Sequence, residues 1–504
     1  MDFDKVLKYL GYCFIIKTSY DIVNYSYPKI RNRYKKLPIV QKIRNNIKEE
    51  HIENIKKELN KDIVGNKLYL EIPKENMAEE DISTIIDKLI KLQRFDINKG
   101  MFSGTMYTNN INLDKFLNKN FLNFFRSNPL HIDTFPAIRK MESEIISMMI
   151  NLFNGGEQVC GCFTSGGTES ILLACKTYRD WGISKGINEP EIIISSTAHA
   201  SYKKAATYFK IKLIEIPCKN DGLFDLNELE KNININTVLV VGSAPSYNLG
   251  IIDQIESISK IVSPKNIGLH LDACLGAFLL NFKEDILDFR IPGVTSISAD
   301  IHKYGGTPKG ASVILYKNKE LMKYQYYIDE KWTGGIYATH TFKASRNGNI
   351  VALSWITLLY MGLNGYLKNY KHIIETKNYF VKKINEIEEL FIYGKPELGI
   401  AAVGSNKFNI NILTNKLKDK KWNLNMIQKP KGFHLCITIC HNKQIIDKLI
   451  NDIKVIIKDI NVDDKINNSI YVYGTNQEIN DNELAKEIVI EYLHNINMLP
   501  NEQE

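Results

Sequence analysis

Paired cysteine motifs and long apolar runs are both missing from this 504-residue sequence. Its eight cysteines are scattered, and no two are spaced as Cys-X-X-Cys, so neither a zinc ribbon nor a thioredoxin-type redox centre is expected. No other metal motif stands out, and no secretory signal with a small-residue cleavage site is recognisable. We therefore expect a metal-free protein with reduced, mostly buried thiols that faces the cytosol.

The charge balance does not indicate a nucleic-acid partner, because a net charge of +8 is spread over the whole chain. Residues 1–28 contain one apolar run, 9–16, which is too short to cross a membrane, since a span needs roughly 20 apolar residues. A basic stretch without acidic residues follows over 22–48. This pattern predicts contact of residues 1–48 with an anionic membrane surface, and a helix that packs on the protein is the alternative.

The order of sequence patterns predicts an N-terminal arm, a large domain and a small domain. Residues 29–99 read as a basic and then helical arm. Residues 100–350 form the expected large domain, which starts with a turn-rich stretch to residue 140 that carries few helix signals. Connecting helices and a smaller α+β domain are expected over 351–504.

Helical and strand-like runs alternate in the second part of the large domain. The strand-like runs are apolar and β-branched, which is typical of a mostly parallel sheet that is covered on both faces. Ligands of such sheets bind at the carboxyl ends of the strands. The expected helices are 141–153, 168–182, 199–209, 225–231 and 253–262, and the expected strands are 191–195, 212–217, 237–243, 267–273, 294–299 and 311–316.

Lys303 lies in a short polar turn between the strand-like runs 294–299 and 311–316. Desolvation between two buried strands disfavours the charged form of a lysine, so we expect its pKa to be lowered. A lysine of this kind can form a Schiff base with a carbonyl group. Because a lone lysine in a hairpin is usually a surface residue, this interpretation depends on further parts of a site.

Three upstream features supply those parts. The turn 165–168 contains two glycines and precedes a helix, whose free N–H groups suit a phosphate, although it is neither a Walker loop nor a Rossmann fingerprint. His199 follows a strand-like run and can stack on a pyridine ring. Asp272 ends another, where its carboxylate can hold a pyridinium nitrogen. Pyridoxal 5'-phosphate is the one ligand that explains all of these features together with Lys303.

The segments that carry these residues resemble the sphingosine-1-phosphate lyases, a branch of the group II decarboxylases among the fold-type I pyridoxal-phosphate enzymes. Matching segments include SNPLHIDTFPAIRK, TSGGTESILLACKTYRDW, HLDACLGAF and SISADIHKYGGTPKGAS. The resemblance covers the chain from about residue 100 onward and, more weakly, 28–99. It implies a transferase-like large domain and cleavage of the C2–C3 bond of sphingosine 1-phosphate, by a retro-aldol reaction, to a fatty aldehyde and phosphoethanolamine.

The resemblance also implies roles for single residues. Lys303 is the implied Schiff-base lysine, Asp272 the pyridinium partner and His199 the stacking residue. The residues implied to hold the cofactor phosphate are Ser165, Gly166, Gly167, Thr168 and His302. Those implied to bind the substrate phosphate or to assist catalysis are Tyr107, Asn128, His131 and Lys309, with Tyr247 near the reacting centre. Lys303, Tyr107 and Tyr247 are the alternatives for the general base.

Further expectations from the resemblance concern assembly and location. Fold-type I enzymes are usually homodimers with sites at the subunit interface, so Tyr107 and Gly334–Gly335 are expected to act across it. Ile301 and Gly306 depart from the family pattern, and Gly306 is expected to widen the pocket. The implied location is the endoplasmic reticulum membrane, with the catalytic domain facing the cytosol; a soluble cytoplasmic protein is the alternative, because the run 9–16 is short.

Two other functions stay open from the sequence. An amino-acid decarboxylase would share the cofactor site, so Lys303 does not discriminate between it and a lyase. A non-catalytic relative that binds or scaffolds other molecules would keep the fold, although the presence of all four cofactor features argues against it. The implied substrate is a long-chain base phosphate, and release of carbon dioxide or of a fatty aldehyde would separate the two enzymes.

Overall fold

The computed structural model describes residues 37–61, 67–92, 99–460 and 482–499. It divides into two compact units, Phe95–Ile466 and a unit formed by Met1–Arg94 with Asn467–Glu504. The last helix therefore belongs with the N-terminal arm, whereas the sequence analysis placed it in the small C-terminal domain.

The unit that contains the N-terminal arm is helical where it is described, with α3 (Pro38–Asn60), α4 (Glu79–Ile90) and α16 (Asn482–Asn495). Ile55 of α3 packs against Leu484 and Ile488 of α16. Arg44 and Lys48 of the basic stretch pair with Glu487 of α16, at 2.6 and 3.4 Å. From Pro38 onward this stretch thus follows the packing alternative, while the apolar run 9–16 lies outside the described residues.

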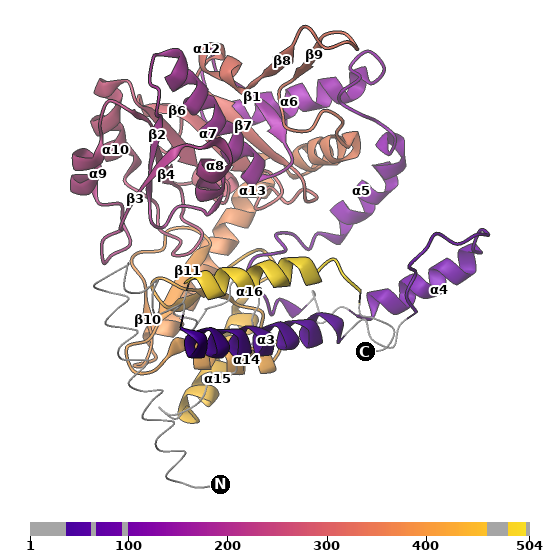
Figure 1. The fold of residues 1–504 in the computed structure, drawn as a ribbon, viewed down its shortest axis with the longest axis vertical. Coiled ribbons are helices and arrows are strands. Elements are labelled where there is room, and N and C mark those ends of the chain that lie inside the picture. Colours follow the sequence, from indigo (N-terminus) through magenta and orange to yellow (C-terminus); the bar gives the residue numbers. More distant parts are fainter. Residues whose placement is uncertain (1–36, 62–66, 93–98, 461–481, 500–504) are drawn as a thin grey trace. The chain divides into compact units, whose positions relative to one another are not determined.

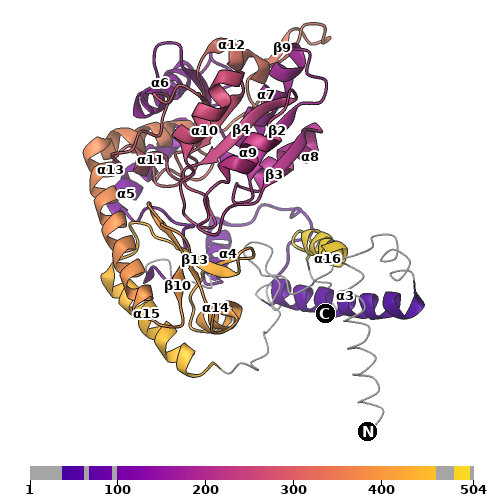
Figure 2. The same cartoon turned by 90° about the vertical axis from the view of Figure 1, so that its left-hand side faces the viewer.

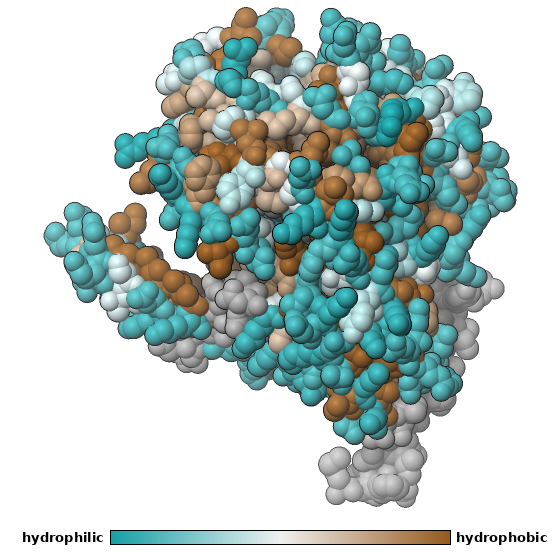
Figure 3. Space-filling view, turned by 180° about the vertical axis from the view of Figure 1, so that it is seen from behind, coloured by the Kyte–Doolittle hydropathy of each residue, from teal (hydrophilic) through white to brown (hydrophobic). Residues whose placement is uncertain are grey.

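One side of α4 is apolar and exposed. Figure 3 shows this apolar side as a brown strip. The exposed apolar side chains of α4 are Ile82, Ile86, Leu89 and Ile90. The first turn of the helix is acidic, with Glu79, Glu80 and Asp81. An acidic helix is poorly suited to an anionic membrane surface, so the charge of α4 does not extend the predicted membrane contact beyond residue 48.

A seven-stranded sheet, in the order β1-β7-β6-β5-β4-β2-β3, forms the centre of the larger unit (Figure 1). Only β7 runs antiparallel to its neighbours, so the predicted mostly parallel sheet is confirmed. The strands are β1 (Cys160–Thr164), β2 (Glu191–Ser195), β3 (Lys212–Ile216), β4 (Thr237–Ser243), β5 (Gly268–Asp272), β6 (Val294–Asp300) and β7 (Ser312–Tyr316).

Helices cover both faces of this sheet, because its strands are apolar on both sides. In β2, Ile192 and Ile194 face the core beneath α7 and α8, whereas Ile193 faces the core that contains residues of α6, α10 and α13. Figure 2 shows these layers from the side. The helices of this part are α5 (Ile111–Phe124), α6 (Pro136–Leu152), α7 (Gly167–Ser184), α8 (Ser201–Phe209), α9 (Leu226–Asn232), α10 (Ile255–Val262), η2 (Ser263–Lys265), α11 (Ala277–Leu280), α12 (Lys319–Met322) and η3 (Lys323–Gln325).

The long helix α13 (Gly348–Asn385) leads to the predicted smaller sheet. By length and composition, α13 is the one helix among the described residues that could cross a membrane. However, 44% of its most apolar window is buried, and Val351, Ala352 and Phe380 belong to the main core. The antiparallel sheet β10-β11-β13-β12 follows, with β10 (Phe391–Ile392), β11 (Ile400–Gly404), β12 (Asn425–Ile427), β13 (Gly432–Cys436), α14 (Ile410–Asp419) and α15 (Lys443–Lys458).

Helix α5 and the strands β1, β8 (Tyr327–Asp329) and β9 (Tyr337–Thr339) were not predicted from the sequence. Asparagine, which favours turns, recurs along α5 and conceals its helical pattern. The helix forms because Leu113 and Leu117 are buried one turn apart and the Asn110 side chain accepts a hydrogen bond from the Leu113 N–H. Tertiary burial therefore outweighs local propensity in this segment.

Candidate active site

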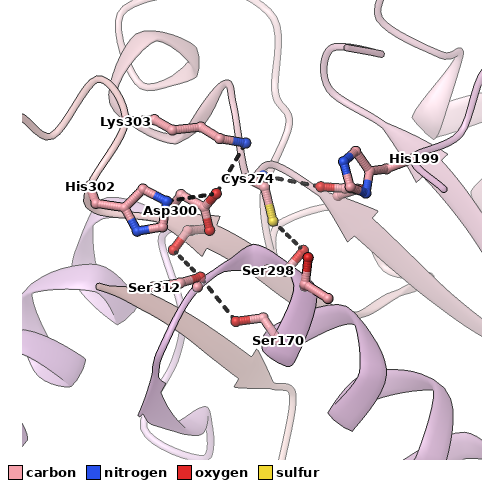
Figure 4. A network of polar contacts seen from close by, with 12 residues as sticks. Ser170, His199, Cys274, Ser298, Asp300, His302, Lys303 and Ser312 are labelled. Atoms are coloured by element: carbon pink, nitrogen blue, oxygen red, sulfur yellow. Dashed lines mark hydrogen bonds and ion pairs between the residues drawn. The ribbon is translucent and has the colours of Figure 1, made fainter. Parts of the chain in front are cut away.

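The loops at the carboxyl ends of the parallel strands carry most of the predicted site residues. The turn 165–168 follows β1, His199 follows β2, and Tyr247 follows β4. Asp272 is the last residue of β5, and Lys303 lies three residues after the end of β6. Figure 4 shows how residues from several of these loops face one another. Parallel strands thus bring residues that are 138 positions apart, from 165 to 303, to one edge of the sheet.

Lys303 faces a carboxylate that the sequence analysis did not assign. Its Nζ lies 3.0 Å from the Asp300 Oδ2, and the side chains of Lys303 and Asp300 are 23% and 2% exposed. Burial lowers the pKa of Lys303, but Asp300, together with Cys274 and Asp272, outweighs burial and raises this pKa above its ordinary value. The predicted depression of the Lys303 pKa is therefore wrong, because a buried anion stabilises its ammonium form.

His302 lies on the other side of Asp300. The Ala311 N–H donates to its Nδ1 at 3.1 Å, so the neutral ring carries its proton on Nε2, which lies 3.6 Å from the Asp300 Oδ2. Burial lowers the pKa of His302 in spite of the neighbouring carboxylate. His302 is thus a neutral N–H donor at neutral pH, and it lies beside the turn 165–168, since a Cβ on Gly166 would meet its Cε1 at 3.5 Å.

The backbone of the turn 165–168 lies close to Asp300 and has no side chain in the way at its two glycines. Gly166 has a φ of +149°, and α7 has no side-chain cap at this end. A Cβ on Gly167 would lie 2.8 and 2.9 Å from the two carboxylate oxygens of Asp300, so this position requires glycine. The backbone N–H of Ser165 is already bound to the Glu169 carboxylate at 2.6 Å. The N–H groups that remain for a phosphate are therefore those of the first turn of α7.

His199 is fixed by two hydroxyl-bearing neighbours. The Ser201 N–H donates to its Nδ1 at 3.2 Å, which leaves the proton of the neutral ring on Nε2, and the Ser201 hydroxyl bonds Thr168 at 3.1 Å. Burial lowers the pKa of His199, so the ring is uncharged at neutral pH and would not repel a protonated pyridine ring. The Tyr247 ring packs edge-on against His199 and His434, with centroids 6.4 and 4.8 Å away.

Asp272 is held by one donor on each oxygen. The Cys274 N–H donates to Oδ1 at 3.1 Å and the buried Tyr202 hydroxyl donates to Oδ2 at 3.2 Å. Asp272 lies opposite Ser298 in the β5–β6 register, and the Cys274 thiol donates to the Ser298 hydroxyl at 3.2 Å. These contacts orient the carboxylate at 7% exposure and leave lone pairs free for a ring N–H.

Tyr107 and Lys309 form another wall of the same site. The Lys309 Nζ lies 4.9 Å from the centroid of the Tyr107 ring, which packs edge-on against Tyr304 at 5.0 Å. The Tyr107 hydroxyl contacts the Cys436 thiol at 3.9 Å. Tyr107 therefore contacts these residues within its own chain. Burial raises the pKa of Tyr107, so it stays protonated and acts as a hydrogen-bond donor rather than as a resident base.

Asn128 and His131 are not joined to these residues by any contact in the described part of the chain. The Asn128 Oδ1 accepts hydrogen bonds from the backbone N–H groups of Leu130 and Arg346, each at 3.1 Å. His131 is exposed on the same loop, between α5 and α6. Gly334–Gly335 lies in the turn of the β8–β9 hairpin, where Gly335 has a φ of +110°.

The two departures from the family pattern have local reasons. Ile301 is fully buried in the main core, which explains an apolar side chain at that position. Gly306 donates its N–H to the Lys303 carbonyl at 2.9 Å and has a φ of +72°. A Cβ there would meet Thr108 only at 3.6 Å, so backbone strain, rather than lack of space, favours glycine.

Several residues at the site were missed from the sequence, namely Asp300, Tyr202 and Cys436. Asp300 had a usable signal, because it ends an apolar strand three residues before Lys303, as Asp272 ends the neighbouring strand. Cys436 had none, since it comes from the small sheet and reaches Tyr107 only through tertiary folding.

Comparison with known proteins agrees with this geometry. The pyridoxal-dependent decarboxylase conserved domain matches residues 71–403. Sphingosine-1-phosphate lyase 1 of Rattus norvegicus is 40% identical over 453 residues, which cover 86% of this chain and 80% of the relative. The chain belongs to the sphingosine-1-phosphate lyase family. The lyase of Saccharomyces cerevisiae is another relative, 38% identical over 84% of this chain and 72% of its own.

Among solved structures, a sphingosine-1-phosphate lyase of Burkholderia pseudomallei has a TM-score of 0.78 and 30% identity, over 87% of this chain and 99% of its own. A glutamate decarboxylase of Lactobacillus brevis has a TM-score of 0.69 and 17% identity, over 81% of this chain and 97% of its own, which shows the shared fold alone. The fold is that of fold-type I pyridoxal-phosphate enzymes, as predicted. The residues present fit this cofactor, since Lys303, Asp272 and the α7 N-terminus offer the amine, carboxylate and N–H groups that it needs, and Gly167 lets that N-terminus lie close to Asp300.

Proposed function

We propose that this member of the sphingosine-1-phosphate lyase family cleaves the C2–C3 bond of long-chain base phosphates, such as sphingosine 1-phosphate. The products are a fatty aldehyde and phosphoethanolamine. The observation that carries the proposal is the grouping of Lys303, Asp272 and His199 with Tyr107 and Lys309, in a chain that is 40% identical to a lyase of this name. The reaction belongs to the breakdown of sphingolipids.

Each side chain has a defined task in such a reaction. Pyridoxal phosphate, when bound, supplies an electron sink for the bond that breaks. Asp272 holds the ring nitrogen protonated, and the neutral His199 supports the face of the ring. The N-terminus of α7 and the Nε2–H of His302 bind the cofactor phosphate. Lys303 would link the cofactor to the protein through its amine.

The C3 hydroxyl proton of the substrate needs an acceptor. Tyr107 is protonated at rest, because burial raises its pKa, so it is better suited to orient the hydroxyl oxygen than to take the proton. A neutral Lys303 amine that is not bonded to the cofactor would be suited to take this proton, because the neighbouring Asp300 would stabilise the ammonium that forms. We therefore favour Lys303 as the base over Tyr107 and Tyr247.

The competing function is that of an amino-acid decarboxylase. It would use the same cofactor contacts but would not need Lys309, a cation for which the described residues provide no carboxylate partner. Incubation of the purified protein with sphingosine 1-phosphate, followed by mass detection of aldehyde, tests the proposal. Carbon dioxide release from glutamate or an aromatic amino acid, without aldehyde formation from the lipid, would favour the decarboxylase.

Lys309→Ala is expected to weaken binding of the substrate phosphate and to leave cofactor binding intact. Burial, together with Lys303, lowers the Lys309 pKa, and a dianionic phosphate would stabilise its charged form. Loss of one charge-assisted contact corresponds to an increase of KM of roughly 10- to 100-fold. The matched control is Lys317→Ala, at the other end of β7, where Nζ bonds the Pro292 carbonyl. Equal loss of cofactor and substrate affinity in Lys309→Ala would contradict this role.

We propose further that the protein is a homodimer in which the loop with Asn128 and His131 completes the substrate-phosphate site of the other subunit. Apolar side chains of the β8–β9 hairpin support this, since Ile328, Trp332 and Ile336 are 59%, 53% and 77% exposed. A cavity of about 420 Å³ lies beside the hairpin and includes Pro129 and Ile132 of the same loop. Light scattering should give about twice the chain mass of 57.9 kDa; a monomer with full activity would contradict the proposal.

Membrane association through the N-terminal segment is the remaining part of the proposal, with the endoplasmic reticulum as the location. It is supported by the long aliphatic tail of the proposed substrate and by the apolar run 9–16 beside basic residues. Co-sedimentation of the purified full chain with vesicles rich in phosphatidylserine tests it. Recovery of the protein only in the supernatant, at low salt, would favour the soluble alternative.

A further inference from the structure

Asp300 is a buried carboxylate with one close cation. It ends β6 and is 2% exposed, and its Oδ2 lies 3.0 Å from the Lys303 Nζ. The other oxygen, Oδ1, has no hydrogen-bond partner among the described side chains and backbone groups. Gly167 and Cys274 close the space on that side, since a Cβ on Gly167 would lie within 2.9 Å of both carboxylate oxygens and of the Cys274 Sγ. Solvent therefore has little access to this anion.

The charge of Asp300 is compensated mainly by Lys303. Burial raises the pKa of Asp300, but Lys303, His302 and the Ser312 hydroxyl together outweigh burial and lower it, so the carboxylate is ionised. His302 is a weaker partner, because it lies 3.6 Å away and its own pKa is lowered by burial. The other groups that act on Asp300, or on which it acts, are Lys309, Cys274, His199, Tyr107 and the hydroxyl of Ser312.

Because Lys303 compensates the charge of Asp300, the protonation state of its nitrogen matters when Lys303 is bonded to the cofactor. If the bonded nitrogen were neutral, Asp300 would be a buried anion whose remaining close partners, His302 and the Ser312 hydroxyl, carry no charge, which is costly in a low-dielectric interior. If the nitrogen keeps a proton, the pair of opposite charges is preserved. The electrostatics of the site therefore favour a protonated nitrogen when Lys303 is bonded to the cofactor.

We propose that Asp300 is a positioning residue that holds a proton on the Lys303 nitrogen in its Schiff base with the cofactor. Protonation makes the carbon of the C=N bond more electrophilic towards the substrate amine. The exchange is balanced: the substrate nitrogen bonds to that carbon, the bond to Lys303 breaks, and the single positive charge and all protons are retained. Asp300 thus keeps the C=N bond protonated before the substrate binds. This role rests on the proposed function only in that it requires the bound cofactor.

The test is a pH titration of the absorption spectrum of the bound cofactor, in the wild-type protein and in Asp300→Asn. In the wild type, we expect the long-wavelength band of the protonated C=N bond to persist well above neutral pH. In Asp300→Asn, this band should convert to the unprotonated form with an apparent pKa that is lower by about one unit or more, as expected for loss of an opposite charge within hydrogen-bond distance. The matched control is Asp288→Asn, which removes a buried carboxylate paired with Arg290, outside the site; it should titrate like the wild type.

Two results would overturn the proposal. One is an unchanged apparent pKa in an Asp300→Asn protein that binds cofactor as fully as the wild type. The other needs no variant: a wild-type protein that loses the protonated band near neutral pH. Should Asp300→Asn fail to fold, Asp300→Glu, which keeps the charge, should retain the wild-type band. The titration measures the absorption of the bound cofactor and needs no lipid substrate. If the aldehyde assay failed, the proposed function would be contradicted, but the titration would still test the role of Asp300.

Discussion

Lys303→Ala is expected to reduce aldehyde formation to the level of a reaction without enzyme. No other described lysine has its Nζ within hydrogen-bond distance of Asp300, and Lys309 lies over the Tyr107 ring, so no second amine is placed to replace it. The variant should also lose the absorption band of the lysine-bound cofactor, because the C=N bond cannot form. The measurements are turnover by mass detection of the aldehyde and the visible spectrum of protein purified with added pyridoxal phosphate.

Loss of the fold is the alternative cause of such a result, because Lys303→Ala removes the cation that pairs with the buried Asp300. Removing Lys303 leaves a buried carboxylate without its cation, a change that typically costs about 3–5 kcal/mol in a buried pair. Lys303→Arg keeps a positive charge beside Asp300 but cannot form the C=N bond, so it should melt near the wild-type temperature and still be inactive. Retained activity in either variant would contradict the assignment of Lys303.

Much of the fold followed from the pattern of apolar runs. The strand runs from 191 to 316 match β2 to β7 within one or two residues, because strands that are buried on both faces are uninterrupted in β-branched residues. The positions of His199 and Asp272 also followed, since both come at strand ends that a parallel sheet gathers at one edge. The local sequence is therefore sufficient to predict the position of a side chain that a single strand places at its end.

The parts that the sequence did not disclose depend on contacts between distant segments. The pKa of Lys303 was predicted to fall because only burial was considered. Asp300, which raises this pKa, is three residues away in the sequence, but its burial by Gly167 and Cys274, from the segments that follow β1 and β5, is visible only in the folded structure. The wall formed by Tyr107 and Cys436 joins positions 329 apart in the chain. Charge pairing inside a core therefore has to be read from the folded structure.

The two carboxylates of the site, Asp300 and Asp272, have partners of different charge. Asp300 has the Lys303 ammonium as its partner, whereas Asp272 has the Tyr202 hydroxyl and the Cys274 N–H. Neutral donors orient a carboxylate without supplying a compensating charge, so Asp272 retains its attraction for a cation. This arrangement suits Asp272 to a pyridinium nitrogen and Asp300 to the nitrogen of Lys303.

Asp272→Asn is accordingly expected to keep the cofactor and to lose most of the activity. Lys303 and the N-terminus of α7 are unchanged in this variant, so the absorption of the lysine-bound cofactor should persist. The amide has the shape of the carboxylate but no charge, so it cannot keep the ring nitrogen protonated while the C2–C3 bond breaks. Loss of one preorganised electrostatic contact of this kind corresponds to a fall in kcat of roughly 100-fold or more.

Tyr202→Phe is the matched control for this prediction, because it removes one hydrogen bond to the same carboxylate and leaves the charge in place. We expect it to lower kcat by at most about tenfold, the typical effect of one hydrogen bond. A kcat for Asp272→Asn within about twofold of the wild type, at full cofactor occupancy, would show that this carboxylate does not support the ring nitrogen. If Tyr202→Phe and Asp272→Asn were equally impaired, the orientation of Asp272, rather than its charge, would be the property that the reaction requires.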